Sequence, residues 1–197
     1  ILGTAGLTGL MCAFAVKARE ELLMQSKVND VLVTGSTGGV GMVAVMVLAK
    51  MGINVFHNFH GMNDHTPLIG VCEAVKKAQK KGYDVIANGT ICIEDNPNVT
   101  ISRCLKFAKQ LIDLGHQGFY LKSASGRLNP EFVYTLTSQL INRFPEQEIT
   151  IHAHSTYGEA PACYISAILA SLLNKKPITI DVQHPALSGS TAQPSMT

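Results

Sequence analysis

The chain has 197 residues, of which 46% are hydrophobic and 15% charged, and its formal net charge is +2. A chain of this length can bury a core as one large domain or two small ones. The small net charge leaves no basic footprint for nucleic acid and no strong attraction to a membrane surface, so we expect neither partner.

The five cysteines are widely spaced and include no C-x-x-C pair. They are typical of small apolar core residues in a reducing compartment, which predicts a cytoplasmic protein.

The opening run Ile1–Val16 is apolar, but glycines interrupt it and no basic region precedes it. It is too short for a membrane span and does not look like a signal peptide. The chain lacks an initiator Met and stops abruptly, so we expect a piece excised from something longer.

Residues 4–25 carry apolar positions at helical spacing, with charged residues on the other side, which predicts an amphipathic helix.

Val31–Thr34 is a strand-like run, and it is followed by the glycine-rich segment Gly35–Gly41. An apolar helix over 42–51 then ends at Gly52. A glycine turn before a helix can bind a phosphate, because the helix start offers free N–H groups. The predicted contacts are Gly35, Ser36, Gly38, Gly39, Val40 and Gly41. Tight packing of strand against helix is the alternative explanation of these glycines.

From residue 53 onward the chain repeats a strand-then-helix pattern about every thirty residues, as successive βα units do. Thr66 and Asn129 each stand before a proline, so we expect both to cap helix starts. Gly82 and Gly115 are placed to end two helices. Together these features predict one compact α/β domain with a six-stranded parallel sheet in sequence order. The expected later strands are 53–59, 84–93, 117–122, 148–154 and 177–183.

The segment Glu148–Gly158 alternates apolar and polar residues with a period of two, which predicts a strand. His152 and His154 therefore project from the same face, just before the next helix. Sites in α/β proteins are built at the carboxyl ends of parallel strands. A metal site here needs further ligands from other strands. Two polar residues that bond only to neighbours or water are the alternative.

Two sequence motifs lie near the start of the chain, Gly3–Thr8 and Val31–Gly41. In these motifs residues 1–52 resemble zinc-free medium-chain dehydrogenase/reductases of the quinone oxidoreductase and acryloyl-CoA reductase type. The resemblance implies a Rossmann-type fragment whose glycine turn cradles the pyrophosphate of NADP. His57 and Asn58 lie where the ribose would be read, and neither is the usual acidic or basic reader.

A second set of motifs runs through the rest of the chain. They are Val55-Phe56, Asn63-Asp64, Gly89–Cys92, Lys122 with Gly126, His152-Ala153-His154 and Ser188–Met196. In these motifs residues 53–197 resemble the carboxyltransferase TIM-barrel domain of biotin-dependent enzymes, such as pyruvate carboxylase and the oxaloacetate decarboxylase α subunit. The resemblance implies strands four to eight of that barrel. We therefore expect a chimera, of engineered origin, in which a half-barrel and one Rossmann-type βα unit join near Gly52 in an open or partly closed sheet.

In the carboxyltransferase family a divalent metal is held by an Asp of the first strand, a carbamylated Lys and two His. The resemblance implies Lys122, His152 and His154 as the last three ligands, with zinc or manganese as the metal. The first-strand Asp has no counterpart in the chain. Ser123 and Ser155 stand where the family commonly has Asp, and the loss of such partners weakens a metal site.

The resemblance further implies that Thr191 matches the threonine that moves a proton between carboxybiotin and the pyruvate enolate. Biotin is implied by the resemblance alone. His57 and His60 stand where the family usually has Arg and Asp.

Three functions remain open: a damaged carboxyltransferase metal site, a partial NADP-binding module, and a non-catalytic α/β scaffold. We favour the scaffold, with an exposed strand edge through which copies of the chain could form a homo-oligomer.

Overall fold

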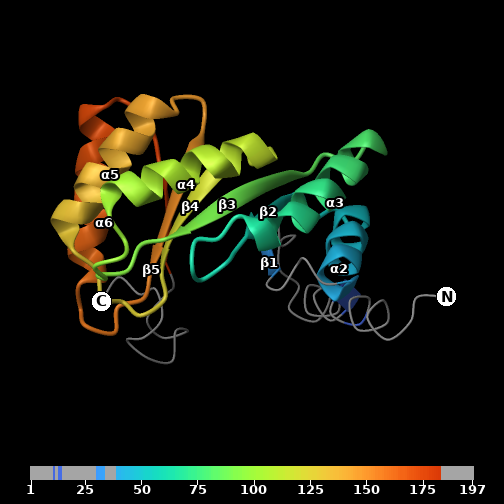
Figure 1. Ribbon diagram of the computed structural model, residues 1–197, viewed down its shortest axis with the longest axis horizontal. Coiled ribbons are helices and arrows are strands. Elements are labelled where there is room, and N and C mark those ends of the chain that lie inside the picture. The colour runs from blue at the N-terminus through green and yellow to red at the C-terminus, as the bar shows by residue number, and fades with distance from the viewer. Residues whose placement is uncertain (1–10, 12, 15–29, 34–38, 183–197) are drawn as a thin grey trace. The chain divides into compact units, whose positions relative to one another are not determined.

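The computed structural model describes residues 11, 13–14, 30–33 and 39–182 (Figure 1). The sheet order is β1-β2-β3-β4-β5-β6, so consecutive strands are neighbours. The pairings of β1 with β2, β2 with β3, β4 with β5 and β5 with β6 are parallel, which confirms the predicted α/β fold with a parallel sheet. The elements are β1 (Asp30–Val33), α2 (Gly39–Lys50), β2 (Val55–Asn58), the 3₁₀ helix η1 (Thr66–Leu68), α3 (Ile69–Lys80), β3 (Ile86–Cys92), α4 (Ile101–Leu114), β4 (Gly118–Ser123), α5 (Pro130–Arg143), β5 (Glu148–Ala153), α6 (Ala160–Leu173) and β6 (Thr179–Asp181).

The described residues fall into two compact units. The first contains those up to Gly89 together with Asp113–His116, and the second contains Thr90–Ile112 and those from Gln117 onward. The division therefore lies inside β3. The expected boundary at position 52 concerns the origin of the two segments, and it stays a prediction.

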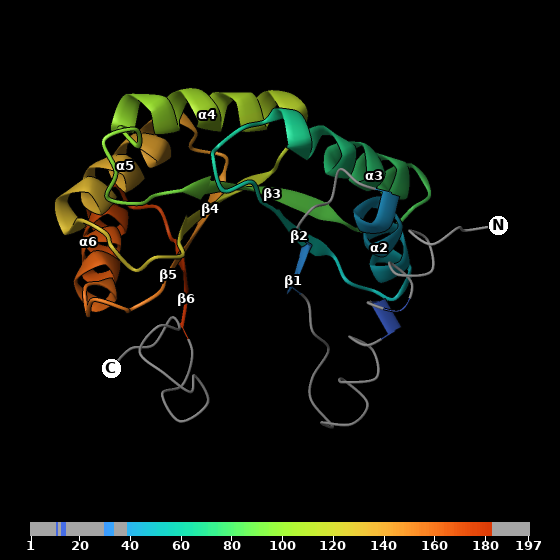
Figure 2. The ribbon, with the colours of Figure 1, turned by 60° about the horizontal axis from the view of Figure 1, so that its bottom comes forward.

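The first unit packs α2 and α3 beside β1 and β2 (Figure 2). Strand β2 contributes the buried Phe56, and α3 is amphipathic, with Val71 and Val75 buried and its lysines outside. Helix α2 is apolar almost throughout, and it ends before Gly52, whose φ of +96° suits glycine. The buried core of this unit consists of Ala13, Val45, Leu48, Ala49, Ile53, Phe56, Val71, Ala74, Val75, Ala78, Val85 and Ala87.

The second unit has helices on one face of its strands and polar side chains on the other. Helices α4, α5 and α6 lie along the same side of β4 to β6 (Figure 2). Because side chains of a strand alternate between faces, one set of residues packs against these helices and the other set does not. The fully buried apolar strand residues of the first set are Phe119, Leu121, Ile149, Ile151 and Ala153. Tyr120, Lys122 and His152 alternate with them and occupy the opposite face.

The predicted helix signals are partly confirmed. Asn129 caps α5 as expected, since its side-chain oxygen accepts from the backbone N–H groups of Glu131 and Phe132. Gly82 and Gly115 follow α3 and α4 with positive φ, also as expected. The prediction for Thr66 is wrong: it lies inside η1, and no side chain caps either η1 or α3. The local turn is held instead by Asp64, whose carboxylate accepts from the Thr66 N–H at 2.9 Å.

Met11, Ala13 and Phe14 are helical, in agreement with the predicted N-terminal helix, and the rest of residues 4–25 lies outside the described residues. Among the residues that the structure describes, no helix is both long enough and apolar enough to cross a bilayer.

Candidate functional site

Three polar residues form a row across the last three strands. Lys122 of β4 is the register partner of His152 of β5, and His152 is the register partner of Asp181 of β6. In-register neighbours on parallel strands project from the same face. All three stand at or next to the last residue of their strand, so they gather at the carboxyl edge where α/β proteins build their sites.

His154 joins this row from the loop that follows β5. The strand ends at Ala153, one residue earlier than the predicted run, but the His154 N–H still donates to the Ser123 carbonyl at 3.0 Å. The ring of His154 therefore stays near that of His152, with centroids 5.3 Å apart. Burial lowers the pKa of His154, and the nearby His152 and Lys122 lower it further while Glu94 opposes them. The neutral imidazole, which is the form that binds metals, is thus favoured.

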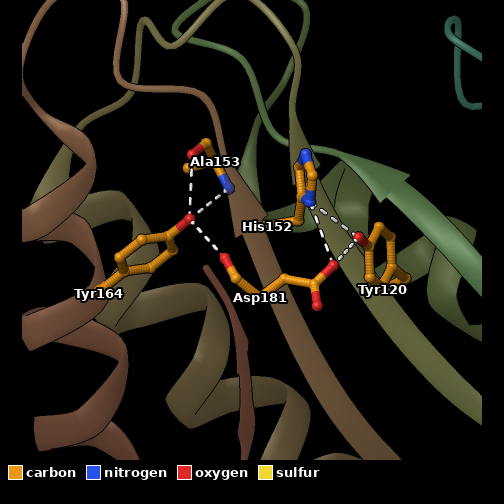
Figure 3. A network of polar contacts seen from close by, with 5 residues as sticks. All are labelled: Tyr120, His152, Ala153, Tyr164 and Asp181. Atoms are coloured by element: carbon orange, nitrogen blue, oxygen red, sulfur yellow. Dashed lines mark hydrogen bonds and ion pairs between the residues drawn. The ribbon is translucent and has the colours of Figure 1, made fainter. Parts of the chain in front are cut away.

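Two polar partners hold one nitrogen of the His152 ring. Nδ1 lies 2.9 Å from the Tyr120 hydroxyl and 3.2 Å from Oδ2 of Asp181, and the Tyr120 hydroxyl also donates to that carboxylate (Figure 3). The other nitrogen, Nε2, is buried and has no hydrogen-bond partner among the described residues. A buried nitrogen without a partner is costly, and each such atom needs an explanation.

Glu94 organises the loop after β4. Its carboxylate accepts from the hydroxyl of Ser123 at 2.9 Å, from the N–H of Ala124 at 2.7 Å and from both the hydroxyl and the N–H of Ser125. Ser123 is one of the two serines that the resemblance places where an Asp was expected. Glu94 therefore brings a carboxylate to the neighbourhood of this position from the loop that follows β3.

The described residues fit a metal only in part. They contain no group of three or more His, Cys, Asp or Glu side chains that could hold an ion. His152 and His154 offer two imidazoles, and Lys122 stands beside them. A protonated lysine repels a cation, so a third ligand at this place requires the carbamate form of Lys122.

Other predicted site residues are elsewhere. Gly39, Val40 and Gly41 form the first turn of α2. His57 lies on β2 and His60 follows it, both in the first unit, where Nδ1 of His60 accepts from the Asp64 N–H at 3.4 Å. The remaining predicted contacts, Gly35, Ser36, Gly38 and Thr191, lie outside the described residues.

Sequence reasoning missed Tyr120, Asp181 and Glu94. Tyr120 stands two residues before Lys122, so the same alternation that paired the two histidines could have placed it on the site face. Asp181 lies within the predicted last strand, but its partner depends on how β6 registers against β5. Glu94 acts through a loop contact about thirty positions along the chain, and no local pattern signals it.

The amino-acid sequence is similar to those of known carboxyltransferases and pyruvate carboxylases. The chain is 31% identical over 147 residues to the methylmalonyl-CoA carboxyltransferase 5S subunit of Propionibacterium freudenreichii subsp. shermanii, a match of 74% of this chain and 26% of the relative. It is 33% identical over 122 residues to a pyruvate carboxylase subunit of Methanocaldococcus jannaschii, with 60% and 20% covered. The chain is similar to carboxyltransferases. No family model matches it.

The fold is similar to that of a solved carboxyl transferase domain. The carboxyl transferase domain of Rhizobium etli pyruvate carboxylase aligns with a TM-score of 0.72 at 23% identity, over 85% of this chain and 29% of that domain. The same domain has been solved with pyruvate and biocytin, with a TM-score of 0.70. This likeness to a carboxyltransferase barrel shows the fold. The chain spans about a quarter of the length of the carboxyltransferase relatives it matches.

The comparisons give no support to a dehydrogenase segment, to NADP or to a chimera. Every relative reported above is a carboxyltransferase or a pyruvate carboxylase. Residues 53–197 make up less than three quarters of the chain, whereas the structural likeness covers 85% of it. The structural likeness therefore includes residues before position 53.

Proposed function

We propose that the chain forms part of a biotin-dependent carboxyltransferase and carries the metal-binding edge of its barrel. His152, His154 and a carbamylated Lys122 would be the ligands that it contributes to a divalent cation. The observation that carries this proposal is the buried Nε2 of His152, which has no hydrogen-bond partner among the described residues. His152 lies in a row with Lys122, in a chain 31% identical to a carboxyltransferase subunit. This function was the alternative to a non-catalytic scaffold, and the similarity favours it.

The donor set agrees with the proposed metal. Neutral imidazole suits zinc and similar ions, and a carbamate offers oxygen ligands as a carboxylate does. To form it, the neutral amine of Lys122 bonds to the carbon of CO₂ and releases one proton to the solvent or a nearby base. The change turns a cation into an anion and so replaces repulsion with attraction. When bound, the cation would act as a Lewis acid that polarises a carbonyl or enolate oxygen.

The same proposal assigns roles to the strands and to Thr191. Strands β2 to β6 would correspond to strands four to eight of the barrel, and the chain would meet biotin and a keto acid through groups that lie partly outside the described residues. Thr191 would be the proton carrier between them. Nothing among the described residues favours the NADP alternative, so carboxyl transfer is the only function that we propose.

A zinc titration tests the metal site. We expect wild-type protein, equilibrated with bicarbonate, to bind zinc saturably in calorimetry, and the His152→Ala, His154→Ala double variant to lose that binding. A His60→Ala, His65→Ala double variant removes two histidines of the first unit and should bind as the wild type does. Equal weak binding in all three proteins would show that the site histidines have only a structural role.

Carbamylation gives a second readout. With ¹³C-bicarbonate, wild-type protein should show a carbamate carbon resonance that grows on addition of zinc, because the metal stabilises the carbamate. Lys122→Ala should lack this resonance. A signal that persists in Lys122→Ala would place the carbamate on another amine and contradict the assignment.

A further inference from the structure

The hydrogen bonds among Tyr120, His152 and Asp181 indicate which atoms of the cluster carry protons. The Tyr120 hydroxyl donates its single proton to Oδ2 of Asp181. An ionised carboxylate can only accept hydrogen bonds, and a hydroxyl whose proton is committed can otherwise only accept. Nδ1 of His152 faces both of these oxygens, at 2.9 Å and 3.2 Å.

Only one arrangement makes all three contacts hydrogen bonds. Nδ1 must carry the proton, since a bare Nδ1 would place a lone pair against two acceptor oxygens. A neutral imidazole holds one ring proton, so Nε2 is then left with its lone pair. That nitrogen is the buried one, which has no hydrogen-bond partner among the described residues.

A second tyrosine fixes the strand that carries the carboxylate. The hydroxyl of Tyr164, on α6, accepts from the Ala153 N–H at 2.9 Å and lies 3.0 Å from the Ala153 carbonyl and 3.1 Å from the Asp181 carbonyl (Figure 3). It therefore ties the carboxyl ends of β5 and β6 together. The His152 ring and the Asp181 carboxylate are held in register by backbone as well as by side chains.

We propose that Asp181, assisted by Tyr120, is a positioning residue that holds His152 in the Nδ1–H tautomer and so presents the Nε2 lone pair to a divalent cation. Metal-bound histidines commonly donate their other ring N–H to a carboxylate, which fixes the ring and raises its basicity as a ligand. The metal half of this inference rests on the proposed function. The tautomer half rests only on the contacts around Nδ1.

The test uses ¹⁵N-labelled protein without metal, at pH 8. Long-range ¹H–¹⁵N correlations distinguish a protonated ring nitrogen from one with a lone pair, and His152→Ala assigns the His152 signals. We expect protonated Nδ1 and bare Nε2 in wild-type protein. In Asp181→Ala the Nε2–H tautomer should appear, and zinc affinity should fall about 10–100-fold, the usual effect of losing such a partner.

Two further variants make the test specific. Tyr120→Phe keeps the carboxylate, so His152 should remain in the Nδ1–H form with a smaller loss of affinity, and this variant also serves if Asp181→Ala does not fold. Asp84→Ala removes an exposed carboxylate outside the cluster and should match the wild type in both measurements.

The outcomes separate this inference from the proposed function. A wild-type His152 with Nε2 protonated would overturn the inference, as would an unchanged tautomer in Asp181→Ala. An Nδ1–H tautomer that depends on Asp181, in a protein that binds no zinc, would support the positioning role and reject the metal site. Zinc binding that needs His152 but not Asp181 would do the reverse.

Discussion

Gly126 shows how one residue can hold a site together. Its φ is +73°, and a Cβ at this position would lie 2.7 Å from the His154 carbonyl oxygen and 2.8 Å from the Thr156 backbone nitrogen. The loop after β4 therefore passes directly against the backbone that carries His154. Both the left-handed conformation and the close approach require glycine.

We expect Gly126→Ala to destabilise the protein and displace His154. The left-handed conformation costs an alanine roughly 1–2 kcal/mol, and the clash with rigid backbone adds roughly 1–3 kcal/mol. Urea unfolding should show the loss of stability, and zinc titration of the folded fraction should show weaker binding.

Gly158→Ala is the matched control for this substitution. Gly158 has a nearly identical φ of +75°, but an added Cβ would meet no atom within 4 Å. It should therefore suffer the conformational cost without the clash. Equal losses of stability in the two variants would show that the approach to His154 carries no energy of its own.

Helix α5 illustrates the energetics of a single element. Asn129 accepts from Glu131 N at 2.8 Å and from Phe132 N at 3.2 Å, and Pro130 follows it in the first turn. The side chain satisfies N–H groups that have no partner inside the helix. The same helix buries Leu136 and Leu140, so the helix that Asn129 caps also contributes to the buried interior of the second unit.

Replacing the cap should cost a measurable amount. We expect Asn129→Ala to lower the free energy of unfolding by about 1 kcal/mol, as for other helix caps. Asn129→Ser keeps an acceptor oxygen and should lose much less. If the Ser and Ala variants are equally unstable in urea, the hydrogen bonds to Glu131 and Phe132 are not the source of the effect.

The elements were predictable from sequence because their signals are local. The period of two in β5 placed His152 on a polar face, and the Asn129-Pro130 pair marked the start of α5. Thr66 misled the prediction because it lies inside η1, after the N-cap, and its own N–H is the group that donates to Asp64. The contacts of Asp181 were not predictable, since strand register is set by pairing between segments about thirty residues apart.

On the scale of the whole molecule, buried thiols are spread through both units. Cys72 lies on α3 of the first unit, and Cys92, Cys104 and Cys163 lie on β3, α4 and α6 of the second. Burial raises the pKa of Cys72 to about 11 and those of the other three to about 12, from an ordinary value of 9.0. The interior therefore excludes the thiolate, as expected for the apolar role predicted from the cysteine spacing.

This burial links stability to alkaline pH. Because the folded-state pKa values are raised, the unfolded chain loses its thiol protons first as pH rises. The contribution is complete below about pH 9 and is lost between pH 9 and the folded values near 11 and 12. Each buried thiol should lower the free energy of unfolding by up to about 1.4 kcal/mol per pH unit in that window.

Urea unfolding of a Cys12→Ser background at pH 7, 8, 9.5 and 10.5 measures this dependence. In the same background Cys104→Ala removes a thiol whose pKa is shifted by burial alone, so its stability should fall less steeply above pH 9. Cys104→Ala will also be less stable at every pH, but that constant offset leaves the slope unaffected. Identical slopes in the two proteins would mean that Cys104 ionises as readily in the folded chain as in the unfolded one, and its burial would then be transient.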